Sequence, residues 1–97
     1  MKKLGLLATL KAKTGKEDEV AQFIKGAVDL ARQENKTLTW YSFKIDNSTF
    51  GIFDSFEDEA GRDAHLNGDI AKALMENADR LLSEAPDIKK IDILSAK

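Results

Sequence analysis

Asp54 and His65 are the two residues of this sequence whose types and spacing best suit chemistry. Asp54 lies in FGIFDSF (50–56), which otherwise has the composition of an apolar strand, and His65 follows eleven residues later as the only histidine in the chain. A carboxylate and an imidazole that border one apolar pocket can exchange protons with a bound molecule. The sequence also allows a purely structural role, in which Asp54 caps the next helix and His65 lies half-exposed on its surface.

Composition argues against several other kinds of site. The chain has no cysteine, which excludes disulfides, iron–sulfur clusters and cysteine-bound zinc, and one histidine among 97 residues argues against a transition-metal site. The net charge of −2 and the isoelectric point near 5.4 argue against a nucleic-acid partner, which requires clustered Lys and Arg. We therefore expect neither a metal ion nor a nucleic acid to be bound.

The chain has no apolar run near the roughly 20 residues that cross a bilayer. Its first residues, MKKLGLLATLKAK, resemble a signal peptide in placing lysines before leucines, but Lys11 and Lys13 interrupt a short apolar stretch. We interpret this segment as the first strand. Residues 1–97 are expected to form a single cytoplasmic domain without a membrane partner.

Hydrophobic periodicity predicts the element order β-α-β-β-α-β. The expected strands are 4–13, 37–45, 50–56 and 88–96, and the expected helical segments are 16–33, 58–66 and one that starts near Ile70 and ends before Pro86. Thr14 and Glu17 have the spacing of a capping box at the first helix. This order is that of the ferredoxin-like split βαβ motif, an α+β fold with a four-stranded antiparallel sheet and helices on one face.

The expected hairpin register assigns each strand residue to a face of the sheet. A turn that closes with Ile45 opposite Phe50 places Tyr41 opposite Asp54. Tyr41, Phe43 and Asp54 then face the helices, whereas Trp40 and Phe53 face the other side, with Leu7 of the first strand beside them. Large exposed apolar patches usually mark interfaces, so we expect a homodimer through Leu7, Trp40 and Phe53.

The helix side of the sheet is the expected place for a small-molecule pocket. Its expected apolar lining is Phe23, Phe43 and Phe56, and its polar groups are Tyr41, Asp54 and His65. A few polar groups that converge in an apolar cavity are typical of a small-molecule site. The residues alone leave this interpretation and the structural one open.

The segment from Asp54 to Gly68 also carries a resemblance. A strand acid and aromatic, Asp54 and Phe56, precede a short helix that ends in Ala64-His65-Leu66 and a small residue, Gly68. In this pattern, and over almost its whole length, the chain resembles the antibiotic biosynthesis monooxygenase family of dimeric α+β barrels.

The resemblance implies a homodimer with one pocket in each subunit. Some members oxidise phenols or quinols with O2 and without a metal, flavin or other cofactor; Asp54 and His65 would then be the candidate bases and Tyr41 or Trp40 the orienting groups. Other members of such barrels only bind ligands or act as stress proteins. Haem-degrading relatives are disfavoured, because Met75 stands where they carry the iron-ligating histidine and Ala8 where they carry an asparagine.

Overall fold

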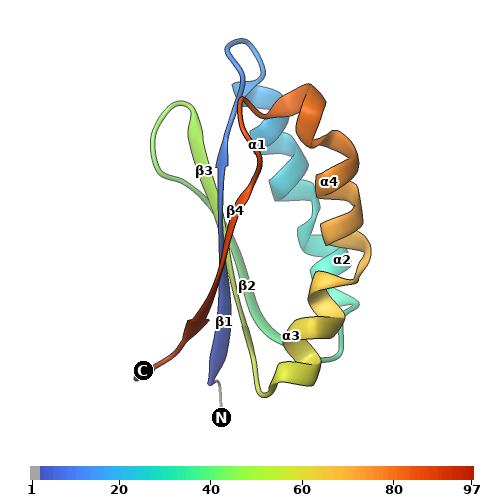
Figure 1. Cartoon of the computed structure of the whole chain (residues 1–97), viewed down its shortest axis with the longest axis vertical. Coiled ribbons are helices and arrows are strands. Elements are labelled where there is room, and N and C mark those ends of the chain that lie inside the picture. Colours follow the sequence, from blue (N-terminus) through green and yellow to red (C-terminus); the bar gives the residue numbers. More distant parts are fainter. Residues whose placement is uncertain (1–2) are drawn as a thin grey trace.

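The computed structural model describes residues 3–97 and contains one antiparallel sheet with all its helices on one face (Figure 1). The strands are β1 (Leu4–Lys11), β2 (Thr37–Lys44), β3 (Thr49–Phe56) and β4 (Asp87–Asp92), and the helices are α1 (Glu17–Gly26), α2 (Val28–Arg32), α3 (Glu59–Leu66) and α4 (Asp69–Leu81). The strand order is β2-β3-β1-β4. The ferredoxin-like α+β fold expected from the sequence is thus confirmed.

Some element boundaries differ from those expected. The helix predicted at 16–33 is divided into α1 and α2, and Lys16 begins α1 without a side-chain cap. The capping box is not formed. The Glu17 carboxylate accepts the backbone N–H of Gly15 rather than that of Thr14, which a capping box would require. The last strand ends at Asp92 rather than near residue 96.

The predicted hairpin register was wrong by one residue. Ile45 donates its backbone N–H to the carbonyl of Thr49 (2.8 Å), so the hairpin closes around a three-residue loop, and the Asp46 side chain accepts the backbone N–H of Ser48 (3.0 Å). This local Asx turn shortens the loop that the sequence interpretation had extended to four residues. A one-residue slip moves every side chain of a strand to the opposite face.

The slip exchanges the two rows of β2. Trp40, rather than Tyr41, pairs with Asp54 and packs against the buried core between sheet and helices. Tyr41 pairs with Phe53 on the uncovered face, where the two rings stack with centroids 6.5 Å apart. Phe43 lies on the same face, with its ring over Gly51. The expectations that Trp40 faces outward and that Tyr41 and Phe43 face the helices were therefore wrong.

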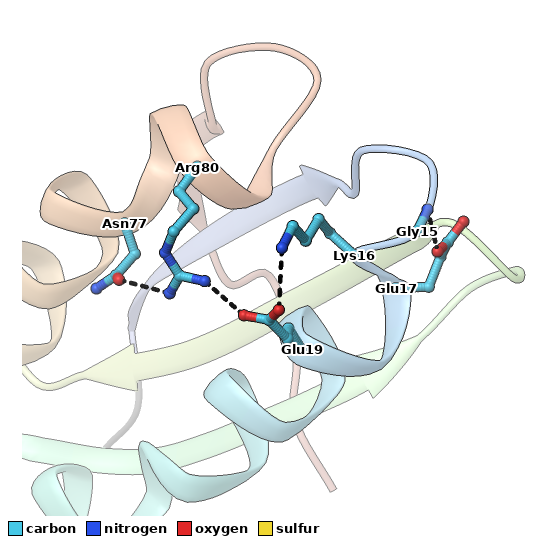
Figure 2. A network of polar contacts seen from close by, with 6 residues as sticks. All are labelled: Gly15, Lys16, Glu17, Glu19, Asn77 and Arg80. Carbon is cyan, nitrogen blue, oxygen red and sulfur yellow. Dashed lines mark hydrogen bonds and ion pairs between the residues drawn. The ribbon is translucent and has the colours of Figure 1, made fainter.

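Buried aliphatic and aromatic side chains fill the space between the sheet and helices α1 and α4. The main buried cluster comprises Leu10, Ala12, Val20, Ile24, Phe50, Ile52, Leu74, Ala78, Leu81 and Leu82. At the surface, Arg80 of α4 binds Glu19 of α1, which Lys16 also contacts, and Asn77 supports the guanidinium from α4 (Figure 2). These polar contacts join the two long helices across the top of the core. In residues 3–97, no helix is long and apolar enough to cross a membrane.

The placement of Trp40 in the core can be tested by its contribution to stability. We expect Trp40→Ala to lower the free energy of unfolding by about 2 kcal/mol or more, because it removes a large, partly buried side chain that packs against the core. Lys44→Ala, in the same row of β2 but exposed, should change it by about 0.5 kcal/mol or less. Urea denaturation of both variants provides the measurement. Equal, small effects would contradict the observed register.

Candidate active site at Asp54 and His65

Asp54 lies in the middle of the sheet on its helix-facing side. Its strand β3 runs between β1 and β2, with Leu6 and Trp40 as the paired neighbours of Asp54. The carboxyl group is 1% exposed. Burial of an ionised carboxylate is costly unless charged or hydrogen-bonding groups compensate it, so the surroundings of Asp54 must supply such groups.

Helix α3 supplies the first of them. Asp58 begins this helix and its side chain accepts the backbone N–H of Gly61 (2.9 Å), so the chain turns back over β3 directly after the strand. Two turns after Asp58, His65 lies over β3 and contacts Asp54, and it is 8% exposed. The structural alternative fails on both points, because Asp58 rather than Asp54 is the cap and His65 is buried.

Both ring nitrogens of His65 contact carboxylates. Nε2 lies 2.8 Å from Oδ2 of Asp54, and Nδ1 lies 2.6 Å from Oε1 of Glu34. Thr37 donates its hydroxyl to the same Glu34 oxygen (2.6 Å), and the Phe56 ring lies beside the imidazole at a centroid distance of 5.4 Å. Asp54, His65 and Glu34 thus form a chain of three ionisable groups, which we call the triad.

Glu34 is the residue that sequence reasoning missed. It lies in QENK, a polar segment between a helix and a strand, and nothing in that composition distinguishes it from a solvated loop residue. Two glycines let this loop approach: a Cβ at Gly61 would lie 3.2 Å from the Lys36 backbone carbonyl oxygen, and one at Gly68 would lie 3.3 Å from Oε2 of Glu34.

The electrostatics of the triad favour a charged imidazole. Burial opposes the charge and lowers the pKa of His65, but the bonds to Asp54 and then to Glu34 outweigh this effect and raise that pKa to about 9. Burial raises the pKa of Asp54, and the bond to His65 opposes that rise. At neutral pH His65 is therefore an imidazolium that donates on both sides, and Asp54 is the remaining candidate base.

One oxygen of Asp54 is left without a partner. Oδ2 faces His65, whereas Oδ1 is buried and has no hydrogen-bond partner among the residues that the structure describes. Asp54 and His65 both line an apolar cavity of about 140 Å³ between the sheet and the helices. Its other walls are formed by Leu6, Ala8, Ile52, Leu66, Ile70, Ala71, Leu74, Met75 and Ile88. Asp54 thus brings a buried, unpartnered acceptor next to a cavity whose lining is otherwise apolar apart from His65.

The other predicted site residues lie outside this lining. Phe56 is fully buried behind His65, and Phe23 packs at the edge of the main core. Trp40 lies in the same row as Asp54 but does not line the cavity, whereas Tyr41 and Phe43 lie on the opposite face of the sheet. The structure therefore brings Phe56 and Trp40 beside Asp54 and His65, although neither lines the cavity, and it does not bring Tyr41, Phe43 or Phe23 to this site.

A wider hollow of about 410 Å³ lies on the other side of His65. It is bordered by the 33–37 segment, by α3 and by the start of α4, and both Glu34 and His65 reach it. The triad therefore links the inner apolar cavity to an open polar surface. Within residues 3–97 no cluster of three or more His, Asp or Glu side chains is arranged to hold a metal ion; in the triad the imidazole separates the two carboxylates.

Comparison with solved structures gives this fold a family context. The NE2512 protein of Nitrosomonas europaea, a protein of unknown function, superposes with a TM-score of 0.98 and 52% identity, covering 100% of this chain and 94% of that one. An antibiotic biosynthesis monooxygenase superposes with a TM-score of 0.81 at 20% identity, covering 95% and 99%. The chain belongs to the same family as NE2512 and has the antibiotic biosynthesis monooxygenase fold.

A more distant relative extends the comparison. PA3566 of Pseudomonas aeruginosa superposes with a TM-score of 0.83 at 21% identity, covering 98% of this chain and 97% of that one. No family model and no curated protein matched the sequence. At identities near 20%, the likeness to the monooxygenase and to PA3566 shows a common fold only. The 52% identity to NE2512 shows a common family.

The charged imidazole should make stability depend on pH. The His65 pKa of about 9 is above the ordinary histidine value of 6.5, so this contribution to stability is complete below about pH 6.5 and is lost as the pH rises through 9. The shift corresponds to at most about 3 kcal/mol. Urea denaturation at intervals from pH 6 to 9.5 should show this decline.

His65→Gln is the matched control, because glutamine does not titrate and the chain has no other histidine. Its free energy of unfolding should be lower at pH 6 and nearly constant up to pH 9. A decline of equal size in the variant would show that His65 is not its source.

Proposed function

We propose that the chain is a cofactor-independent monooxygenase that oxidises a small phenol or hydroquinone with O2. The observation that carries this proposal is the buried, unpartnered Oδ1 of Asp54, a residue that lines an apolar cavity and contacts a charged imidazole. A phenol has one hydroxyl donor, which suits the unpartnered carboxylate oxygen, and an apolar ring, which suits the apolar cavity. The fold shared with an antibiotic biosynthesis monooxygenase supports the same reaction class.

The cavity limits the substrate to about one ring. Its volume of about 140 Å³ is below the roughly 300 Å³ at which sites for drug-sized molecules begin. Apolar cavities of about 150 Å³ take up benzene. A single-ring phenol fits this space, whereas a tetrapyrrole does not, and Met75 at the cavity wall is 59% exposed. Haem binding is therefore not proposed.

The residues supply a base and a fixed cation. The phenol donates its O–H to Oδ1 of Asp54, which takes the proton as the ring becomes electron-rich enough to reduce O2. A ring carbon forms a bond to oxygen, and the O–O bond then breaks as water leaves with the returned proton. One oxygen atom enters the product quinone and the other forms water, so four electrons pass from phenol to O2.

Oxygen consumption with methylhydroquinone and para-methoxyphenol tests the reaction. We expect enzyme-dependent uptake that Asp54→Asn lowers about 10²–10⁴-fold, because asparagine cannot accept the proton. Tyr41→Phe, on the opposite face of the sheet, is the control and should retain the rate. Equal uptake by the Asn variant and the unmodified protein, after subtraction of spontaneous oxidation, would refute the proposed chemistry.

A non-catalytic binding protein is the second candidate. Apart from Asp54 and His65, the cavity lining is entirely apolar, and such a lining is sufficient for binding without turnover. This function predicts that single-ring phenols bind and that Asp54→Asn weakens their binding, while no protein-dependent oxygen uptake occurs with any of them.

We also propose that two copies pair through the uncovered face of the sheet. The corrected register places on it the apolar side chains Leu7, Tyr41, Phe43, Phe53 and Ile91. Tyr41 is 57% exposed in the single chain. Two aromatic side chains of β2, Tyr41 and Phe43, thus face away from the helices, which is typical of a surface covered by a partner. Leu7 and Phe53 keep the role expected from sequence, and Tyr41 and Phe43 replace Trp40.

Sedimentation at micromolar concentration should give roughly twice the chain mass of 10.7 kDa. Tyr41→Lys should shift the protein to the single-chain mass, because it places a charge in the apolar patch. Leu38→Lys also changes an exposed apolar residue of β2, but at the register irregularity between Thr37 and Thr39, where it borders a hollow with Val28 and Ala31, and should leave the mass unchanged. A single-chain mass for the unmodified protein would exclude the homodimer.

A further inference from the structure

Glu34 has the contacts of a residue built into the site. Its Oε1 accepts from His65 Nδ1 and from the Thr37 hydroxyl, both at 2.6 Å, and its side chain is 20% exposed. The lack of a side chain at Gly68 leaves room for its other oxygen. Contacts with His65, Thr37 and Gly68 thus hold the Glu34 carboxylate at Nδ1 of His65, on the side of the ring away from Asp54.

The number of protons at His65 follows from this arrangement. Carboxylate oxygens can only accept, so each ring nitrogen must carry a hydrogen if both contacts are to be hydrogen bonds. Only the imidazolium has both hydrogens. A neutral ring would direct a lone pair at Asp54 or at Glu34, and one of the two short contacts would become repulsive.

We propose that Glu34 is the positioning residue of this site: it holds His65 as a cation against Oδ2 of Asp54 and so leaves Oδ1 free to receive the hydroxyl of a single-ring phenol. The ligand class rests on the proposed function, whereas the role of Glu34 rests on the contacts alone. Glu34 does not touch the inner cavity and acts through His65.

The other charged groups around His65 do not replace Glu34. Asp54 faces Nε2 from β3, while Lys36 and Asp69 border the outer hollow from the 33–37 segment and the start of α4. Arg62, on the same helix as His65, directs its guanidinium to the backbone carbonyls of Gly5 and Ile91. In residues 3–97, Glu34 is therefore the carboxylate in contact with Nδ1.

The single histidine provides a direct measurement, since one imidazole gives one set of NMR signals. In the unmodified protein these signals should titrate with a midpoint near pH 9. Glu34→Gln should lower the midpoint by about one pH unit or more, as expected for loss of an adjacent opposite charge. Glu76→Gln, at an exposed position of α4, makes the same change in net charge and should not move it.

The second measurement is the affinity for para-methoxyphenol as a function of pH. This single-ring phenol keeps its proton over the range tested. We expect the affinity of the unmodified protein to be nearly constant from pH 7 to about 8.5, and that of Glu34→Gln to fall over this range by about fourfold or more, because a neutral His65 no longer holds Asp54. Glu76→Gln should behave as the unmodified protein.

Thr37→Val keeps the charge of Glu34 but removes one of its hydrogen bonds. It should lower the His65 midpoint in the same direction by a smaller amount, and it supplies the comparison if Glu34→Gln does not fold. An unchanged midpoint and an unchanged binding profile in the folded variants would overturn the role of Glu34, even if phenol oxidation is observed.

These outcomes separate the two proposals. A lowered midpoint and a shifted binding profile without oxygen uptake would support the role of Glu34 and contradict the oxidation. A lowered midpoint together with no phenol binding by the unmodified protein would overturn the phenol site.

Discussion

The buried carboxylate of Asp54 is the constraint on which the rest of the site depends. It lies on a central strand, flanked by paired neighbours on both sides, and Asp54 is 1% exposed. A charge in that position requires a compensating charge above the sheet. Helix α3 provides this charge with His65. The short connection from β3 to α3 determines where the imidazole lies relative to Asp54. The early turn at Asp58 thus has an electrostatic consequence as well as a structural one.

A second carboxylate then balances the imidazolium. Burial of His65 alone would favour the neutral ring, and one acidic partner must offset the desolvation of both groups. Glu34 adds a partner on the other nitrogen, at the border of the outer hollow where solvent reaches it more easily. The result is asymmetric. The carboxylate nearer the surface is held by two donors, whereas the deeper one retains an oxygen with no partner in the part of the chain that the structure describes. The unpartnered acceptor is therefore on the deeper of the two carboxylates.

The sequence predicted those features that depend on local pattern. Asp54 faces the helices because Ile52 and Phe56, two residues away on either side, are core residues, and this alternation holds whatever strand pairs with β3. The faces of Tyr41, Phe43 and Trp40 depended instead on the length of one loop. Asp46 shortened that loop by a side-chain hydrogen bond, and all three assignments changed. Glu34 was beyond prediction for a different reason, since its partner lies 31 residues away and only the packing at Gly61 and Gly68 brings the two together.

Selectivity in such a cavity depends on shape more than on polar contacts. Asp54 and His65 are its polar lining residues, and the sheet wall contributes the small side chain of Ala8 beside Leu6 and Ile52. The opposite wall comes from α4, where Ile70 and Leu74 are buried and therefore set a firm boundary, while Met75 lines the cavity and is yet largely exposed. Met75 thus lies where the cavity meets solvent. Its flexible thioether can adapt to a ring that enters, which neither a branched side chain nor an imidazole would do as readily. Met75 therefore forms the adjustable part of the cavity wall.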